Sequence, residues 1–239
     1  MLRISQPNEH PLFSFVSGYR EDIDRKIPSG VHKNSTCFSK MDRYPEQVAF
    51  VKELMEQTKK KPLRVLDIGV AQGQEPLTHI KSAFDLAQKT GRRIASFLNL
   101  KTVDILKTPP PLSYEATTLP VEVLAFLAKI YRSDFGRSFW GMPIEKVAEM
   151  LLKTGRKFDV VLFNNVIQHM SPKNEPILPS CFEKLTDLVS SKGNFCFSCE
   201  RKVMLGPSPI PNRRVQIMMD VLSRKNFVKI AKGIFTRRR

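Results

Sequence analysis

The chain has 239 residues, of which 41% are hydrophobic and 26% are charged, and its net charge is +16. This length and composition suffice to bury a core without disulfides or metals, and they exclude wholesale disorder. No apolar run approaches the roughly 20 residues of a membrane-spanning helix, and the first ten residues contain no apolar segment of a signal peptide. We therefore expect a cytoplasmic protein, although an effector exported without such a signal would have the same features.

The first hundred residues predict the opening of a doubly wound sheet. Residues 1–45 are irregular and interrupted by prolines, and they could form a lid over a cofactor, a partner-binding arm, or both. Apolar periodicity then predicts a helix over 46–60, a buried strand over 63–68, a helix over 75–89 and a strand over 94–103. A strand, a loop, a helix and a second strand in this order are typical of a parallel sheet.

The rest of the chain continues this alternation. We expect helices over 119–131, 143–153, 181–189 and 215–222, strands over 158–163 and 193–198, a proline-rich loop over 207–212 and a closing hairpin arm over 227–235. The predicted fold class is therefore α/β: a Rossmann-like, doubly wound, mostly parallel sheet with a small N-terminal extension. We place the extension at residues 1–60 and the main domain at residues 61–239.

The loop after the first strand carries the strongest signal. It runs from Asp67 through Gly69 to Gly73, and glycines at this point let the backbone approach a nucleoside closely. The spacing matches neither the G-x-G-x-x-G of dinucleotide sites nor a P-loop that ends in G-K-[ST]. Such a loop is not arranged for a pyrophosphate. S-adenosylmethionine has no pyrophosphate, and its adenosine and methionine groups fit a loop of this kind.

Polar residues stand at three further points where a ligand would contact the sheet. Asp104 follows the second strand, where an acidic side chain can accept hydrogen bonds from both hydroxyls of a ribose. Glu75 opens the helix after the glycine loop, where it either complements the helix dipole or contacts the amine of a cofactor. Asn164 and Asn165 end the strand over 158–163. They could hold the methionine part of a cofactor, orient a substrate oxygen, or form an ordinary strand-end turn.

These motifs resemble those of the class I S-adenosylmethionine-dependent methyltransferases. More narrowly, the chain is similar to the chemotaxis receptor (CheR-type) methyltransferases. The G-E-E-P of that group corresponds to residues 73–76, its T-x-F-F-R-D segment to 36–42, its C-R-N-V-L-I-Y-F strand end to 163–170 and its late S-E to 198–200. The resemblance implies S-adenosyl-L-methionine as the cofactor. It assigns cofactor binding to Asp67, Gly69, Gly73, Glu75, Asp104, Asn164 and Asn165.

The resemblance also supplies the catalytic candidates. Lys40, or Arg43 three residues later, stands where the family has a functional arginine, and His169 stands where it has a tyrosine. His169 could act as a general base if the methyl acceptor is a hydroxyl, whereas a carboxylate acceptor needs no base. Otherwise His169 is a packing or surface histidine. The acceptor stays open among a protein carboxylate, a small molecule and RNA. The alternative function is a catalytically inactive methyltransferase-fold protein that binds nucleic acid or a partner through its basic surface.

Two compositional features complete the prediction. Residues 201–239 contain eleven Lys and Arg but a single acidic residue, Asp220. A segment of this charge attracts nucleic acid or an acidic protein, and a solvated surface is the other interpretation. Cys196 and Cys199 form a C-x-x-C, but side chains three apart in a strand point to opposite faces. We therefore expect reduced packing cysteines and no metal site.

Overall fold

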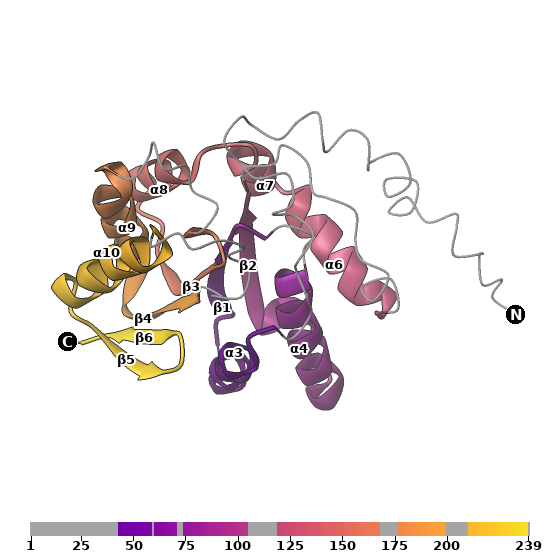
Figure 1. Ribbon diagram of the computed structural model, residues 1–239. Coiled ribbons are helices and arrows are strands. Elements are labelled where there is room, and N and C mark those ends of the chain that lie inside the picture. Colours follow the sequence, from indigo (N-terminus) through magenta and orange to yellow (C-terminus); the bar gives the residue numbers. More distant parts are fainter. Residues whose placement is uncertain are drawn as a thin grey trace, which may run out of the picture.

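The computed structural model of the chain describes residues 43–58, 60–70, 74–104, 119–167, 176–198 and 210–238. Within these residues, six strands form a single sheet in the order β2-β1-β3-β4-β6-β5 (Figure 1). The strands are β1 (Leu63–Ile68), β2 (Leu98–Val103), β3 (Phe158–Asn164), β4 (Val189–Ser198), β5 (Phe227–Ala231) and β6 (Ile234–Arg237).

The strand directions define where a ligand would bind. β1 pairs in parallel with β2 and β3, and β3 pairs in parallel with β4. The chain leaves β1 for β2 on one side and later returns to β3 on the other, so a topological switch point lies between β1 and β3. The mostly parallel sheet confirms the predicted fold class. β6 runs antiparallel to β4 and β5 and lies between them, which departs from the all-parallel order of dinucleotide-binding sheets.

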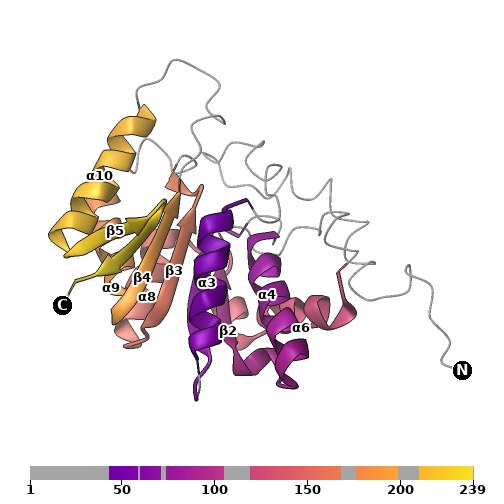
Figure 2. The same cartoon turned by 90° about the horizontal axis from the view of Figure 1, so that it is seen from below.

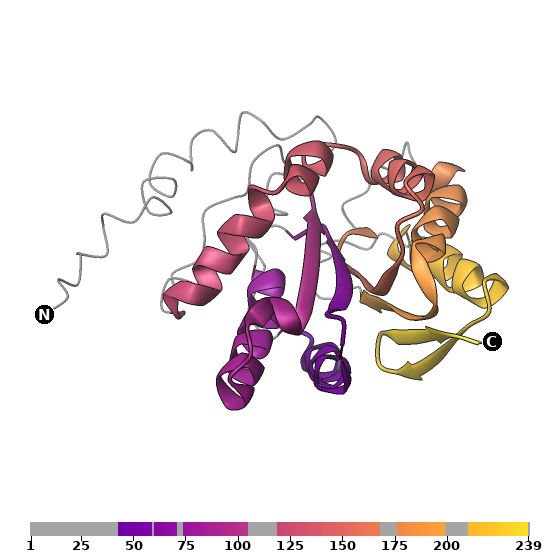
Figure 3. The ribbon, with the colours of Figure 1, turned by 180° about the vertical axis from the view of Figure 1, so that it is seen from behind.

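Helices cover both faces of the sheet, as Figures 2 and 3 show from two further directions. One face packs against α3 (Pro45–Gln57), α4 (Gln74–Thr90) and α6 (Val121–Tyr131). The other face packs against α7 (Asp134–Phe139), α8 (Ile144–Lys153), α9 (Leu178–Asp187) and α10 (Ile210–Arg224). Because β1 and β3 are buried on both faces, they appear in the sequence as nearly continuous apolar runs. No helix in the described ranges is long and apolar enough to span a membrane.

The structure corrects two predicted strand boundaries. The strand expected over 94–103 begins at Leu98, because Ile94–Ser96 form a 3-10 helix, η3, before it. The strand expected over 193–198 begins earlier, at Val189. An irregularity in the pairing of β4 with β3 accommodates the extra residues, so they stay within the strand.

Several helix predictions also needed correction. α3 ends at Gln57 rather than at residue 60. α9 covers 178–187 rather than 181–189, because its expected last residue already belongs to β4. α10 begins at residue 210, so the end of the loop expected over 207–212 is helical, which is compatible with a proline in the first turn. α7 was not expected. It is a six-residue helix whose first turn is capped by Ser133, which accepts a hydrogen bond from the amide of Gly136.

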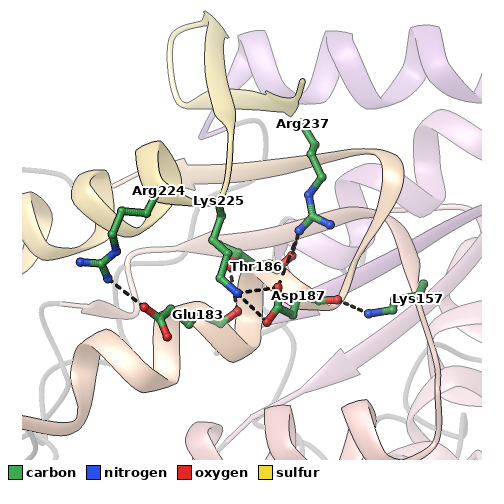
Figure 4. A network of polar contacts seen from close by, with 7 residues as sticks. All are labelled: Lys157, Glu183, Thr186, Asp187, Arg224, Lys225 and Arg237. Atoms are coloured by element: carbon green, nitrogen blue, oxygen red, sulfur yellow. Dashed lines mark hydrogen bonds and ion pairs between the residues drawn. The ribbon is translucent and has the colours of Figure 1, made fainter. Parts of the chain in front are cut away.

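The basic C-terminal segment is tied to α9 by its own cations (Figure 4). These contacts join α10 and the β5–β6 hairpin to the end of α9. They are Arg224 Nη2 to Glu183 Oε1 at 2.9 Å, Lys225 Nζ to Asp187 Oδ2 at 2.8 Å, and Arg237 Nη2 to the Thr186 carbonyl oxygen at 2.7 Å. Some of the positive charge therefore serves the packing of this domain. Binding of nucleic acid or an acidic protein by this segment stays a prediction.

Candidate functional site

The loop after β1 lies at the switch point, and Gly69 brings three strand ends together. Its φ of +76° is in the left-handed region that glycine adopts without strain. Its amide donates a hydrogen bond of 2.9 Å to the carbonyl oxygen of Val103, the last residue of β2. A Cβ atom on Gly69 would lie 2.4 Å from Cγ2 of Val166, which follows β3. Both the backbone angle and the contact therefore require glycine here.

Two buried carboxyl groups, those of Asp67 and Asp104, lie at the carboxyl ends of β1 and β2. Neither carboxyl oxygen of Asp67 has a hydrogen-bond partner of good geometry among the described residues. Burial raises the pKa of Asp67 well above its usual value, and the negative charges of Glu75 and Asp104 raise it further. The backbone amide of Ile68 lowers this pKa, but its effect is the smallest of the four. Buried polar atoms normally have partners, so the Asp67 carboxyl group fits a ligand that supplies donors or positive charge.

A tyrosine hydroxyl lies near these two acids. Tyr131 is the last residue of α6, and its buried hydroxyl has no hydrogen-bond partner within the part of the chain that the structure describes. Burial raises the pKa of Tyr131, and the charges of Asp67 and Asp104 raise it further. Trp140 contacts the ring edge-to-face at 5.0 Å between centroids, and its own Nε1 is fixed by donating to the Thr102 carbonyl oxygen at 3.0 Å. The phenol is thus held beside the two acids.

A network of amides links the acid at the start of α4 to three other elements. Asn164, at the end of β3, donates through Nδ2 to Glu75 Oε1 at 2.6 Å and to Gln47 Oε1 at 2.7 Å. Gln47 of α3 in turn donates through Nε2 to Asn164 Oδ1 and to the carbonyl oxygen of Gly233, both at 3.2 Å. Gln47 and Asn164 are buried. The network joins α3, α4, β3 and the turn of the β5–β6 hairpin at the same edge of the sheet.

The start of α3 lies against the residue that follows β3. Asn165 has a φ of +54°, and its amide donates to the carbonyl oxygen of Ser198 at 2.8 Å. Its side-chain Nδ2 donates to the hydroxyl of Tyr44. The guanidinium of Arg43 lies 5.8 Å from the centre of the Tyr44 ring, and its positive charge lowers the pKa of Glu75. This segment therefore supplies a phenol and a cation to the acidic edge.

The structure places six predicted cofactor residues at one edge of the sheet. They are Asp67, Gly69, Glu75, Asp104, Asn164 and Asn165. Arg43 lies close enough for its charge to act on Glu75. Lys40, Gly73 and His169 lie outside the described residues. The roles assigned to all of these residues stay predictions.

Sequence reasoning missed Gln47, Tyr44 and Tyr131. Gln47 of α3 and Tyr44, which directly precedes α3, meet their partners across more than a hundred residues of sequence. A glutamine in an amphipathic helix is usually a solvent-facing residue, so its burial gave no sequence signal. Tyr131 entered the prediction only as the last residue of the helix expected over 119–131. A buried tyrosine usually needs a polar partner, which is the one signal that could have singled it out.

Glu75→Gln is expected to make the protein more stable above neutral pH. Burial raises the pKa of Glu75 from 4.5 to about 7, against the opposing effects of Asn164 and Arg43. A raised acid pKa means that stability from this group is lost as the pH rises from 4.5 to about 7. Gln removes the charge and keeps an oxygen for Asn164. Urea unfolding should show a gain on the order of 1–2 kcal/mol at pH 8, discounted for partial exposure, and almost none at pH 4.5.

The control for this prediction is Asp85→Asn, which neutralises an exposed acid of the same helix. His79 contributes the opposite slope, because burial lowers its pKa to about 4, so acidification below 6.5 destabilises the fold. That slope is common to the wild type and to the variant, and it cancels in their difference. A gain that is independent of pH would contradict the raised pKa of Glu75.

Comparisons with known proteins give similarity in overall fold only. No protein-family model matches the chain, and no curated protein sequence matches it significantly. Similar solved structures include a SAM-dependent methyltransferase from Agrobacterium tumefaciens, with 14% identity, a TM-score of 0.43 and coverage of 81% of this chain and 51% of that chain. The magnesium protoporphyrin IX methyltransferase of Synechocystis PCC 6803 with bound SAM has 15% identity, a TM-score of 0.41 and coverage of 81% and 79%.

A third structure, the N-methyltransferase NodS from Bradyrhizobium japonicum, has 13% identity and a TM-score of 0.42, and the match covers 83% of this chain and 100% of NodS. The chain spans only 41% to 59% of the length of three matched structures, among them the one from Agrobacterium tumefaciens. At these identities and TM-scores, the comparisons assign neither a substrate nor a reaction to this chain. None of the three structures described is a chemotaxis receptor methyltransferase by name, so the CheR-type similarity stays a prediction.

Proposed function

We propose that the chain is a methyltransferase that binds S-adenosyl-L-methionine at the carboxyl ends of β1, β2 and β3. The observation that carries this proposal is the group of acids at the switch point. Asp67, Glu75 and Asp104 interact unfavourably as negative charges, and Asp67 has no donor of good geometry among the described residues. S-adenosylmethionine brings an ammonium and a sulfonium group, so its binding would relieve this repulsion.

The residues present fit the parts of this cofactor. Asp104 is positioned to accept hydrogen bonds from ribose hydroxyls, as acids do at the equivalent strand end of dinucleotide sites. Asp67 and Glu75 would face the positive groups. Gly69 lets the loop turn in a left-handed conformation at the switch point, where the nucleoside would bind. Asn164 fixes the Glu75 carboxylate through the 2.6 Å hydrogen bond, so this acid is oriented before the cofactor binds.

The same charges disfavour the competing class of nucleotide. A nicotinamide dinucleotide carries a negatively charged pyrophosphate, which usually binds the glycine loop and the first turn of the following helix. Here Glu75 occupies that first turn and Asp67 precedes the loop. Three acids at this edge would repel the pyrophosphate, which supports the sulfonium cofactor over NAD.

For methyl transfer, the protein mainly has to position the acceptor and exclude water. The cofactor would supply a methyl group already activated by the positive sulfur. The residues of this chain would hold an acceptor in line with it, a contribution that can reach several kcal/mol. The Asn165–Tyr44 pair lies at the same edge and could orient an acceptor oxygen. A protein carboxylate would need no base, whereas a hydroxyl acceptor would need one, for which His169 remains the candidate.

Calorimetry with S-adenosylhomocysteine and with NAD tests the cofactor assignment directly. We expect micromolar binding of S-adenosylhomocysteine and no detectable binding of NAD at millimolar concentration. Transfer of labelled methyl groups to acidic protein, RNA and small-molecule pools then tests catalysis. Cofactor binding without transfer would favour the inactive, partner-binding alternative. Tight NAD binding, or no nucleoside binding by the folded protein, would refute the proposal.

Tyr131→Phe is expected to weaken S-adenosylhomocysteine binding several-fold without destabilising the fold. The hydroxyl is buried without a partner in the described part of the protein, so its removal leaves no new unpaired group. Its electrostatic interaction with Asp67 and Asp104 supports a role beside the proposed ribose and amine positions. Calorimetry and thermal unfolding measure the two effects separately. A loss of stability with unchanged affinity would assign the hydroxyl a structural role instead.

A further inference from the structure

A basic groove lies on the face of the sheet that α7 to α10 cover. Residues of β1 and β2 line it together with the start of α7 and the loop from α8 to β3. The groove has a volume of about 550 Å³, and Arg64, Asn99, Lys101, Phe135 and Arg156 are among the residues that line it. Lys101 precedes Asp104 by three residues and Arg64 precedes Asp67 by three, so at a rise of about 3.3 Å per residue the groove lies on the order of 10 Å from the acidic edge.

Two cations in this groove lie near the same aromatic ring, and neither is paired with an acid among the described residues. Lys101 Nζ and the guanidinium carbon of Arg156 each lie 5.5 Å from the centre of the Phe135 ring. Neither has a hydrogen bond or an ion pair to another described residue. Burial lowers the pKa of Lys101, and the positive charge of Arg156 lowers it further. The fold thus maintains an unfavourable pair of positive charges over one ring, a repulsion that a bound anion would relieve.

Two more cations, Arg64 and Lys157, line the groove and already have partners, which limits the proposal to the pair. Lys157 Nζ donates to the carbonyl oxygen of Asp187. Arg64 forms a two-point interaction with Asp159, with Nη2 to Oδ1 at 2.7 Å and Nε to Oδ2 at 3.1 Å. The Arg64 side chain is therefore fixed along the wall of the groove. Asp134 also lines the groove, but its carboxylate is fully exposed and pairs with Arg137 at 2.9 Å. These acids do not compensate Lys101 and Arg156.

We propose that this groove is a phosphate-binding site, with Lys101 and Arg156 as the two ligand-contacting cations. A phosphate between them would accept charge-assisted hydrogen bonds from both side chains. The phosphate could belong to a free anion such as pyrophosphate or to the backbone of RNA, and the net charge of +16 favours the approach of either. This site is separate from the proposed cofactor site and does not depend on it.

The test uses substitutions that remove one charge and preserve packing. Lys101→Met keeps an unbranched side chain against Phe135, and Arg156→Gln keeps a polar surface residue. Each has a matched control on the other side of the protein. Lys52→Met neutralises an exposed lysine of α3, and Arg92→Gln neutralises an exposed arginine whose guanidinium lies 4.4 Å from the centre of the Phe97 ring.

Two measurements are made, each at two salt concentrations. Calorimetry measures the binding of pyrophosphate, and fluorescence anisotropy measures the binding of a single-stranded RNA oligonucleotide. We expect Lys101→Met and Arg156→Gln each to raise the dissociation constant of at least one of these ligands about tenfold. The control variants should change it less than twofold. Loss of pyrophosphate binding identifies a site for free anions, and loss of RNA binding alone identifies a backbone contact. Both results support the site. Equal binding by groove and control variants, or no binding of either ligand by the wild type, would overturn it. Unchanged thermal unfolding verifies that each variant is folded.

Discussion

Asp104→Asn is expected to weaken S-adenosylhomocysteine binding about 100-fold. The side chain is buried at the end of β2, where both ribose hydroxyls would donate to it. Hydrogen bonds to a charged acceptor contribute about 1.5–3 kcal/mol each, and a neutral amide accepts only one of the two and accepts it more weakly. A loss of about 3 kcal/mol corresponds to two orders of magnitude in the dissociation constant. Calorimetry on the wild type and the variant measures it.

The matched control is Asp85→Asn, on the exposed side of α4, where the carboxylate pairs with Lys81 at 3.1 Å. That substitution removes the same charge and should leave cofactor binding unchanged. Asparagine has nearly the volume of aspartate, and the backbone hydrogen bond from Gly141 to the Asp104 carbonyl oxygen does not involve the side chain. Circular dichroism should therefore show a folded variant. If the folded Asp104→Asn protein binds as tightly as the wild type, Asp104 does not contact the cofactor.

Gly69→Ala is expected to lower the free energy of unfolding by about 2–4 kcal/mol and to abolish cofactor binding. A left-handed backbone costs a residue with a side chain about 1–2 kcal/mol. The new Cβ would also lie 2.4 Å from Cγ2 of Val166, a stiff, branched side chain that cannot rotate away without strain. The loop must then separate from the end of β3, which moves the proposed ligand contacts apart. Urea unfolding and calorimetry measure the two effects.

Two further variants separate the causes. Gly91→Ala has the same kind of backbone penalty, with a φ of +66°, but its Cβ would meet nothing within 4 Å, so it should cost only about 1–2 kcal/mol. Val166→Ala removes the opposing methyl group, so in combination with Gly69→Ala it should recover the part of the loss due to the clash. If Gly69→Ala and Gly91→Ala are equally destabilising, the contact with Val166 contributes nothing.

The fold class was predictable because its elements have periodic or continuous apolar patterns. β1 and β3 are buried on both faces, and each helix carries one apolar side, so their positions follow from local sequence. The boundaries were less predictable. The start of β4 depends on its pairing with β3, where an irregularity accommodates residues that alone resemble a turn. The reversed position of β6 depends on a strand pairing that no local pattern specifies.

The sequence also determined which strand ends carry the acids of the candidate site. Asp67, Gly69 and Asp104 follow parallel strands, and the carboxyl ends of parallel strands meet at one edge. Only the tertiary structure decided what completes that edge. It is completed by Gln47 of α3, by Tyr44 directly before α3, and by Tyr131 of α6. Apolar contacts elsewhere on these helices determine how they pack.

The same division applies to the basic groove. Lys101 and Arg156 are unremarkable in the sequence, because a lysine in an edge strand and an arginine in a loop are usually solvated charges. The packing of α7 places the Phe135 ring within 5.5 Å of both cations. Local sequence thus specifies the elements and the residues at their ends, because those depend on patterns within a few residues. Contacts between distant residues were decided by tertiary packing, because burial removes water and makes the position of each charge and hydrogen bond matter.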